Sequence, residues 1–167
     1  FMTSCSLPRT KSSVSISLDT VLRLTPDQDN QTTATSLLGS PARQIQMPDL
    51  GDTLWIYNDK KDGRQRLSLI FDKHFKLQSV LWLVRDGEPE IHLENSQKKF
   101  PTAQFGSQDA PWENPHAAPD ERFYTDEKRG ISIVLRRARN EVQSVGWSNP
   151  SLIQSNKDRK PAVQYEL

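Results

Sequence analysis

Cysteine and histidine, two of the residue types that most often act as nucleophiles, bases or metal ligands, are few in this sequence. The chain holds one cysteine, Cys5, and three histidines, and none lies at the spacing of a metal-binding motif. His74 falls in an expected turn, His92 in a polar connection and His116 between prolines, so each is interpreted as solvated. No nucleophile elbow, phosphate loop or dinucleotide motif occurs. The sequence therefore predicts no enzymatic activity, no cofactor and no metal.

Carboxylates are plentiful, and a repeated motif, Tyr-x-Asp-x-Lys-x-Gly, accounts for the most regular of them. It occupies residues 57–63 and again residues 124–130. In each copy a tyrosine ends a strand, charged residues solvate a turn, and glycine supplies the positive φ. We interpret both copies as matched β-turns rather than as a ligand site. A carboxylate pair assembled by the fold, as in a hydrolase, stays open as an alternative function.

The repetition extends beyond this motif and indicates two copies of one supersecondary unit. Gly39-Ser40 returns as Gly106-Ser107 at the same offset, and residues 77–82 (LQSVLW) return as residues 142–147 (VQSVGW). The sequence predicts an α+β fold of two tandem units, each a short helix followed by a three-stranded antiparallel meander. Because each half is near the size at which a separate core becomes marginal, the halves should share a core or a continuous sheet.

The expected organisation divides the chain into four parts. They are a signal remnant and tether, the first unit, the second unit and a polar tail, at residues 1–13, 14–93, 94–148 and 149–167. In the first unit a helix is expected to begin at Thr25-Pro26 and to end at Gly39. In the second unit a shorter helix is expected to begin near Pro101.

The tryptophans separate into an expected core set and one expected contact residue. Trp55, Trp82 and Trp147 fall on predicted strands, where they would fill the core. Trp112 lies in a proline-rich connection, where an aromatic side chain is a typical partner contact, although packing onto its own domain is the alternative. A basic turn is a second candidate surface, with a solvated hairpin tip as its alternative. The expected partner-binding residues are Pro111, Trp112, Glu113, Pro115, Arg136, Arg137 and Arg139.

Composition limits the classes of partner. The chain has 22 basic and 21 acidic residues, a net charge of +1 that argues against binding nucleic acid. No stretch approaches the roughly 20 apolar residues needed to span a bilayer. Nothing in the sequence indicates a small-molecule substrate.

The residues around Cys5 resemble the end of a bacterial lipoprotein signal. Small residues precede the cysteine, and a serine-rich tether follows it. The resemblance implies that residues 1–4 are removed and that Cys5 carries acyl chains that hold the protein to a lipid bilayer. Ser6 resembles the outer-membrane sorting preference. The alternative is an incidental cysteine near the start of the chain.

Four short segments resemble the SmpA/OmlA (BamE-like) small outer-membrane lipoproteins. They are residues 37–41 (LLGSP), 55–57 (WIY), 67–72 (LSLIFD) and 77–80 (LQSV). The wider fold includes the β-lactamase inhibitor proteins, which are tandem copies of a helix-plus-sheet unit. The resemblance covers about residues 25–84, with a weaker echo over residues 98–147. This chain departs from the small lipoprotein of the β-barrel assembly machinery, the BamE member of that group, because it has two such units instead of one.

The resemblance implies a non-enzymatic lipoprotein at the periplasmic face of the outer membrane. Such a protein would act as a protein-binding adaptor or scaffold subunit, with membrane or envelope proteins and the lipid bilayer as its partners. The alternative, from the inhibitor members of the fold, is a secreted protein that inserts loops into an enzyme's cleft.

Overall fold

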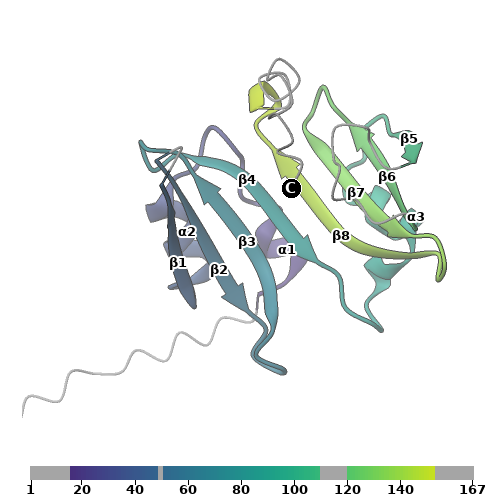
Figure 1. Cartoon of the computed structure of the whole chain (residues 1–167), viewed down its shortest axis with the longest axis horizontal. Helices are drawn as coiled ribbons and strands as arrows, with labels where there is room; N and C mark the ends of the chain where they lie inside the picture. The colour runs from purple at the N-terminus through teal and green to yellow at the C-terminus, as the bar shows by residue number, and fades with distance from the viewer. Residues whose placement is uncertain (1–15, 49–50, 110–119, 153–167) are drawn as a thin grey trace, which may run out of the picture.

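The computed structural model describes residues 16–48, 51–109 and 120–152. Eight strands form one antiparallel sheet in the order β1-β2-β3-β4-β8-β7-β6-β5 (Figure 1). The strands are β1 Arg43–Met47, β2 Asp52–Asn58, β3 Gln65–Phe71, β4 Leu77–Leu83, β5 Gly106–Asp109, β6 Glu121–Asp126, β7 Ile131–Arg136 and β8 Glu141–Ser148. The described helices are short: α1 Leu18–Val21, α2 Gln31–Leu38, the 3-10 helix η1 Pro89–Ile91 and α3 Leu93–Lys98.

The expectation of two helix-plus-three-strand units is wrong, because the fold is dominated by the eight-stranded sheet. Each half supplies four strands, and the additional ones, β1 and β5, lie in segments that the sequence presents as polar connections. In β1 only Ile45 and Met47 are half-buried. That strand is therefore held by backbone pairing with β2, which leaves little hydrophobic pattern to detect.

The expected continuous sheet is confirmed at the centre of the molecule. β4 pairs antiparallel with β8, so the last strand of the first half lies beside the last strand of the second half. Ser79 lies opposite Ser148, and their hydroxyl oxygens are 2.9 Å apart. The two halves consequently meet through main-chain hydrogen bonds rather than through a loose domain interface.

The first expected helix ends as predicted, with Gly39 as its C-cap, but both expected helices begin at other residues. α2 begins after Asn30, whose side chain accepts the Thr33 N–H while the Thr33 hydroxyl accepts the Asn30 N–H. This reciprocal cap prevails over the predicted start at Thr25, whose N–H is bound by the Asp29 carboxylate at 2.6 Å. In the second half the helix is α3, which ends before Pro101 rather than beginning there.

One face of the sheet carries the hydrophobic core, and the short helices pack on that face (Figure 1). A row of core side chains crosses five adjacent strands in register: Trp55, Leu69, Val80, Trp147 and Ile131. Trp55, Trp82 and Trp147 are buried, so their expected core positions are confirmed. The Trp147 indole nitrogen also donates to the Leu24 carbonyl at 3.0 Å, which fastens the segment after α1 to β8.

The two copies of the turn motif differ in how they use their aspartates. Asp59 lies in the β2–β3 turn, where its carboxylate accepts the Lys61 N–H at 2.8 Å. Asp126 is only 5% exposed, so the expectation that it solvates a turn is wrong. Its carboxylate accepts the backbone N–H groups of Gln104 and Arg129 and therefore anchors the segment that precedes β5.

Candidate binding cleft

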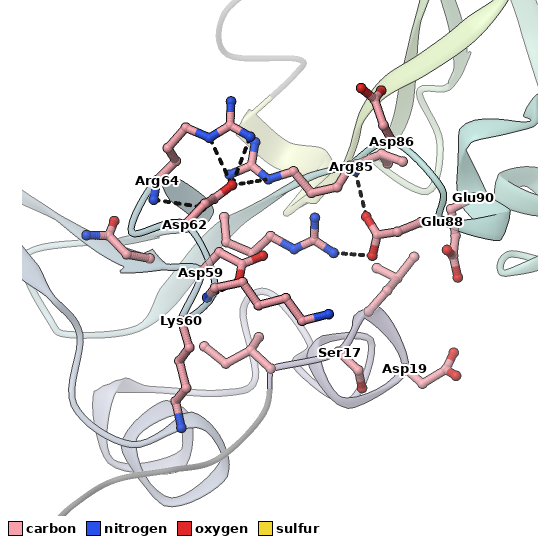
Figure 2. A pocket seen from close by; sticks show the side chains of 16 residues that line it. Ser17, Asp19, Asp59, Lys60, Asp62, Arg64, Arg85, Asp86, Glu88 and Glu90 are labelled. Carbon is pink, nitrogen blue, oxygen red and sulfur yellow. Dashed lines mark hydrogen bonds and ion pairs between the residues drawn. The ribbon is translucent and has the colours of Figure 1, made fainter.

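A cavity of about 710 Å³ opens between the β2–β3 turn, the β4–η1 connection and the start of α1 (Figure 2). We call it the cleft. Its lining contains five basic and six acidic side chains and few apolar ones, among them Ile16, Leu18 and Val84. The cleft has the volume of a small-ligand site, but its walls are far more charged than such sites usually are.

Arg66 enters the cleft because β3 is irregular at its start. Tyr57 pairs with Leu67 and Asn58 pairs with Gln65, so Arg66 is an extra residue with no partner across the ladder. Its guanidinium carbon lies 4.0 Å from the centroid of the Trp82 ring, on the core side of the sheet. The Arg66 side chain is 7% exposed, and its Nη2 donates to Glu88 Oε2.

A chain of ionic contacts fixes the rim beside Arg66. Asp62 pairs with Arg64 at 2.8 Å and with Arg85 at 3.9 Å, and Figure 2 shows the three side chains gathered together. Glu88 Oε1 accepts the Arg85 N–H at 2.6 Å, so one carboxylate holds both Arg66 and the β4–η1 connection. These contacts join the hairpin of the first half to the chain that leads into the second.

The opposite wall is acidic and is tied to the second half through one lysine. Lys99, which follows α3, pairs with Asp19 of α1 at 2.8 Å and with Glu90 of η1 at 3.6 Å. The hydrogen bond with Asp19 raises the pKa of the Lys99 ammonium, with Glu90 adding to the shift. Asp86 also lines the cleft, and its carboxylate makes no ion pair with another described residue.

The protonation chemistry of the cleft suits fixed charges rather than proton transfer. Hydrogen bonding from the Arg64 backbone and side chain lowers the pKa of Asp62 below its ordinary value of 3.8. No histidine, cysteine or tyrosine belongs to the described lining, and Ser17 uses its hydroxyl to cap α1. Within the described part of the chain, no cluster of three or more His, Cys, Asp or Glu side chains could hold a metal ion.

The residues predicted from the sequence to bind a partner are not brought together here. Cys5, Pro111, Trp112, Glu113 and Pro115 lie outside the described residues. The basic turn, Arg136, Arg137 and Arg139, connects β7 to β8 and does not line the cleft. All three of its arginines are exposed, and Arg136 lies 3.8 Å from Asp120.

Sequence reasoning missed the cleft because its residues carry ordinary turn signals. The turn signal of the β2–β3 reversal accounts for Asp59, Asp62 and Gly63, and the segment that follows Val84 up to Glu88 carries no motif. Arg66 immediately precedes the apolar run of β3, so simple alternation would send it to the face opposite Leu67. The irregular pairing of β3 with β2 turns the Arg66 side chain to the core face, and no sequence pattern predicts that irregularity.

Comparison with known proteins leaves the family open. No family model matches the chain, and no curated protein gives a significant match. A DUF4309 family protein (YjgB) from Bacillus subtilis is similar at 13% identity and a TM-score of 0.48, covering 75% of this chain and 81% of that one. An extracellular protein containing an SCP domain, from Bacillus anthracis, is similar at 15% identity and a TM-score of 0.46. That match covers 89% of this chain and 52% of the other.

Both TM-scores are below 0.5, so neither likeness supports an inference about this protein's function. Among the described helices, none has the length and apolar character required to span a bilayer.

Proposed function

We propose that the chain is a non-enzymatic, protein-binding module of a bacterial envelope lipoprotein, and that the cleft receives a segment of its partner. Acyl chains on Cys5 would hold the protein at the periplasmic face of the outer membrane. The partner is a membrane or envelope protein. The observation that carries the proposal is the cleft itself, whose charges are held in place by ion pairs on strands, turns and short helices.

Fixed, ionised groups favour recognition over catalysis. A general acid or base works best when its pKa lies near the operating pH, whereas the pKa of Asp62 is lowered away from neutrality. Charges held on opposite walls contribute orientation and partner discrimination more than raw affinity. An extended peptide segment of a few residues fits a cavity of about 710 Å³.

A site-specific photo-crosslinking experiment tests this function. Benzoylphenylalanine replaces Lys60 at the cleft, Arg139 at the basic turn or Thr32 on the exposed side of α2, in otherwise full-length protein. After irradiation of native envelopes, Lys60 should give one stoichiometric protein adduct and Thr32 none. An adduct at Arg139 alone would move the contact to the basic turn and contradict the proposal for the cleft.

Two variants make the result specific. Lys61→Glu reverses a cleft charge without breaking any ion pair among the described residues, so it should abolish the Lys60 adduct while the protein stays folded. Cys5→Ala tests the membrane setting. It should release the protein from the membrane fraction, and identical membrane recovery with and without Cys5 would refute lipid anchoring.

A further inference from the structure

Arg66 holds a buried hydrogen-bond donor that nothing in the described protein satisfies. Its Nη1 is inaccessible to solvent and has no hydrogen-bond partner, although the side chain lines the cleft. A guanidinium stays protonated at all accessible pH values, so this group is a permanent buried cation with unused N–H bonds. Unsatisfied buried donors are rare in folded proteins and call for a physical explanation.

The residues around Arg66 hold its guanidinium in place but leave Nη1 without a hydrogen-bond partner. The Trp82 ring covers one face of the guanidinium at 4.0 Å, and Glu88 binds Nη2. Lys61 lines the same cleft and makes no ion pair with another described residue. The arrangement provides a stacked, oriented guanidinium with a second cation on the neighbouring turn, which is how proteins commonly recognise planar oxyanions.

We propose that the cleft binds a carboxylate of the partner protein and that Arg66 Nη1 is the donor that recognises it. This inference rests on the proposed function and specifies its chemistry. Acidic side chains outnumber basic ones in the lining by six to five, so a dianionic phosphate would meet more repulsion than a monoanion. A planar carboxylate also matches the guanidinium fork in shape.

Access requires a motion of Arg66. Nη1 is covered by protein atoms, so the proposal requires the guanidinium to turn in its own plane over the Trp82 ring when a ligand oxygen binds. Cation–π attraction depends mainly on the distance of the cation from the ring face, so an in-plane turn retains the stacking. The contact with Glu88 can be kept at the other end of the guanidinium because Nη2 carries two hydrogens.

Titration of the full-length, isotope-labelled chain with small probes tests the inference by NMR. The probes are N-acetylglycine, its uncharged amide and inorganic phosphate, and the readouts are the dissociation constant and the Arg66 side-chain N–H shifts. N-acetylglycine should bind and shift the Arg66 Nη resonances, whereas the amide should not. Equal binding of acid and amide, or preference for phosphate over the carboxylate, would overturn the assignment.

Matched substitutions separate Arg66 from general electrostatics. Arg64 pairs with Asp62 at the rim and its side chain is 71% exposed, so Arg64→Met removes the same charge from the same cleft. Arg66→Met should weaken carboxylate binding about tenfold or more, and Arg64→Met about twofold or less. Equal losses in both variants would show that the cleft responds to net charge, which contradicts a specific donor at Arg66.

A third variant keeps the test decisive if Arg66→Met fails to fold. Glu88→Gln retains an oxygen that accepts the Arg85 N–H but removes the negative charge beside the guanidinium, which repels an incoming carboxylate. It should bind N-acetylglycine more tightly than the parent, and unchanged or weaker binding would refute the proposal.

The two proposals can fail separately. Carboxylate binding without any crosslinked partner would refute the proposed function. A Lys60 adduct without carboxylate binding would refute only this inference.

Discussion

The indole nitrogen of Trp147 in β8 donates to the carbonyl oxygen of Leu24 at 3.0 Å, in a buried position. The residues are far apart in sequence, and their contact fastens the start of the described chain to its last strand. Trp55 occupies the same cross-sheet row, yet its indole nitrogen is buried without a hydrogen-bond partner among the described residues. The two tryptophans therefore form a natural pair for measuring what the hydrogen bond contributes.

Trp147→Phe should cost more stability than Trp55→Phe. Both substitutions remove comparable apolar surface, but only the first leaves the buried Leu24 carbonyl without its donor. An orphaned buried polar group costs about 1–3 kcal/mol, and this is the expected difference between the two variants. Urea unfolding followed by circular dichroism measures it. Equal losses in the two variants would show that the hydrogen bond contributes nothing net.

Gly130→Ala should be far more damaging than Gly63→Ala, although the two glycines end the two copies of one turn motif. Both have positive φ, 70° at Gly63 and 71° at Gly130, so each alanine incurs left-handed strain of about 1–2 kcal/mol. A Cβ at Gly63 meets open space, whereas one at Gly130 would lie 2.1 Å from the Ser148 carbonyl oxygen. We expect Gly63→Ala to fold and Gly130→Ala to lose the β8 end of the sheet, which thermal unfolding would reveal. Similar melting temperatures would contradict this.

Asp126 should make stability sensitive to acid. The backbone N–H of Gln104 lowers the pKa of the Asp126 carboxyl below its ordinary value of 3.8, and Arg129 adds to the effect. The stabilisation is therefore complete above pH 3.8 and is lost as the pH falls through the lower pKa of the folded protein. Asp126→Asn should flatten the acid side of the stability–pH curve, measured by unfolding from about pH 6 to about pH 2. An acid limb identical to that of the parent would exclude Asp126 as its source.

Tyr57 should make stability sensitive to alkali in the opposite direction. Burial raises the pKa of its hydroxyl above the ordinary 10.0, and the hydroxyl donates to the Gly39 carbonyl at 3.0 Å. The unfolded chain releases this proton above pH 10.0 while the folded chain keeps it, so stability declines as the pH rises. Tyr57→Phe should lose about 0.5–1.5 kcal/mol at neutral pH and show a shallower alkaline decline. Tyr124→Phe is the matched control, and equal alkaline curves for the two variants would refute the assignment.

Apolar periodicity and motif spacing were sufficient to predict three features of the fold: the repeat, the shared sheet and the core tryptophans. β1 and β5 could not, since strands at a sheet edge are held by main-chain pairing and need few buried side chains. The start of α2 was misplaced because two caps compete, and Asn30 with Thr33 satisfies more backbone groups than Thr25 does.

The candidate site was less predictable than the fold. Its key residue, Arg66, faces inward through one irregular ladder position, and its partner Glu88 lies in a connection with no motif. Arg66 and Glu88 meet only in the folded chain, and their separation in the sequence does not predict that contact. The expected contact residues Pro111, Trp112, Glu113 and Pro115 stay predictions, as does the lipid at Cys5.

The attachment of α1 has a mechanical consequence. The described chain starts at Ile16 on the cleft wall. α1 is held by the buried side chains of Leu18 and Val21, by the Asp19–Lys99 pair and, just beyond it, by the Trp147–Leu24 hydrogen bond. Under the proposed lipid anchoring at Cys5, tension from the membrane would reach the fold at α1 rather than at the edge strand β1. Because Asp19 also lines the cleft, such a pull would act on a residue of the proposed binding site.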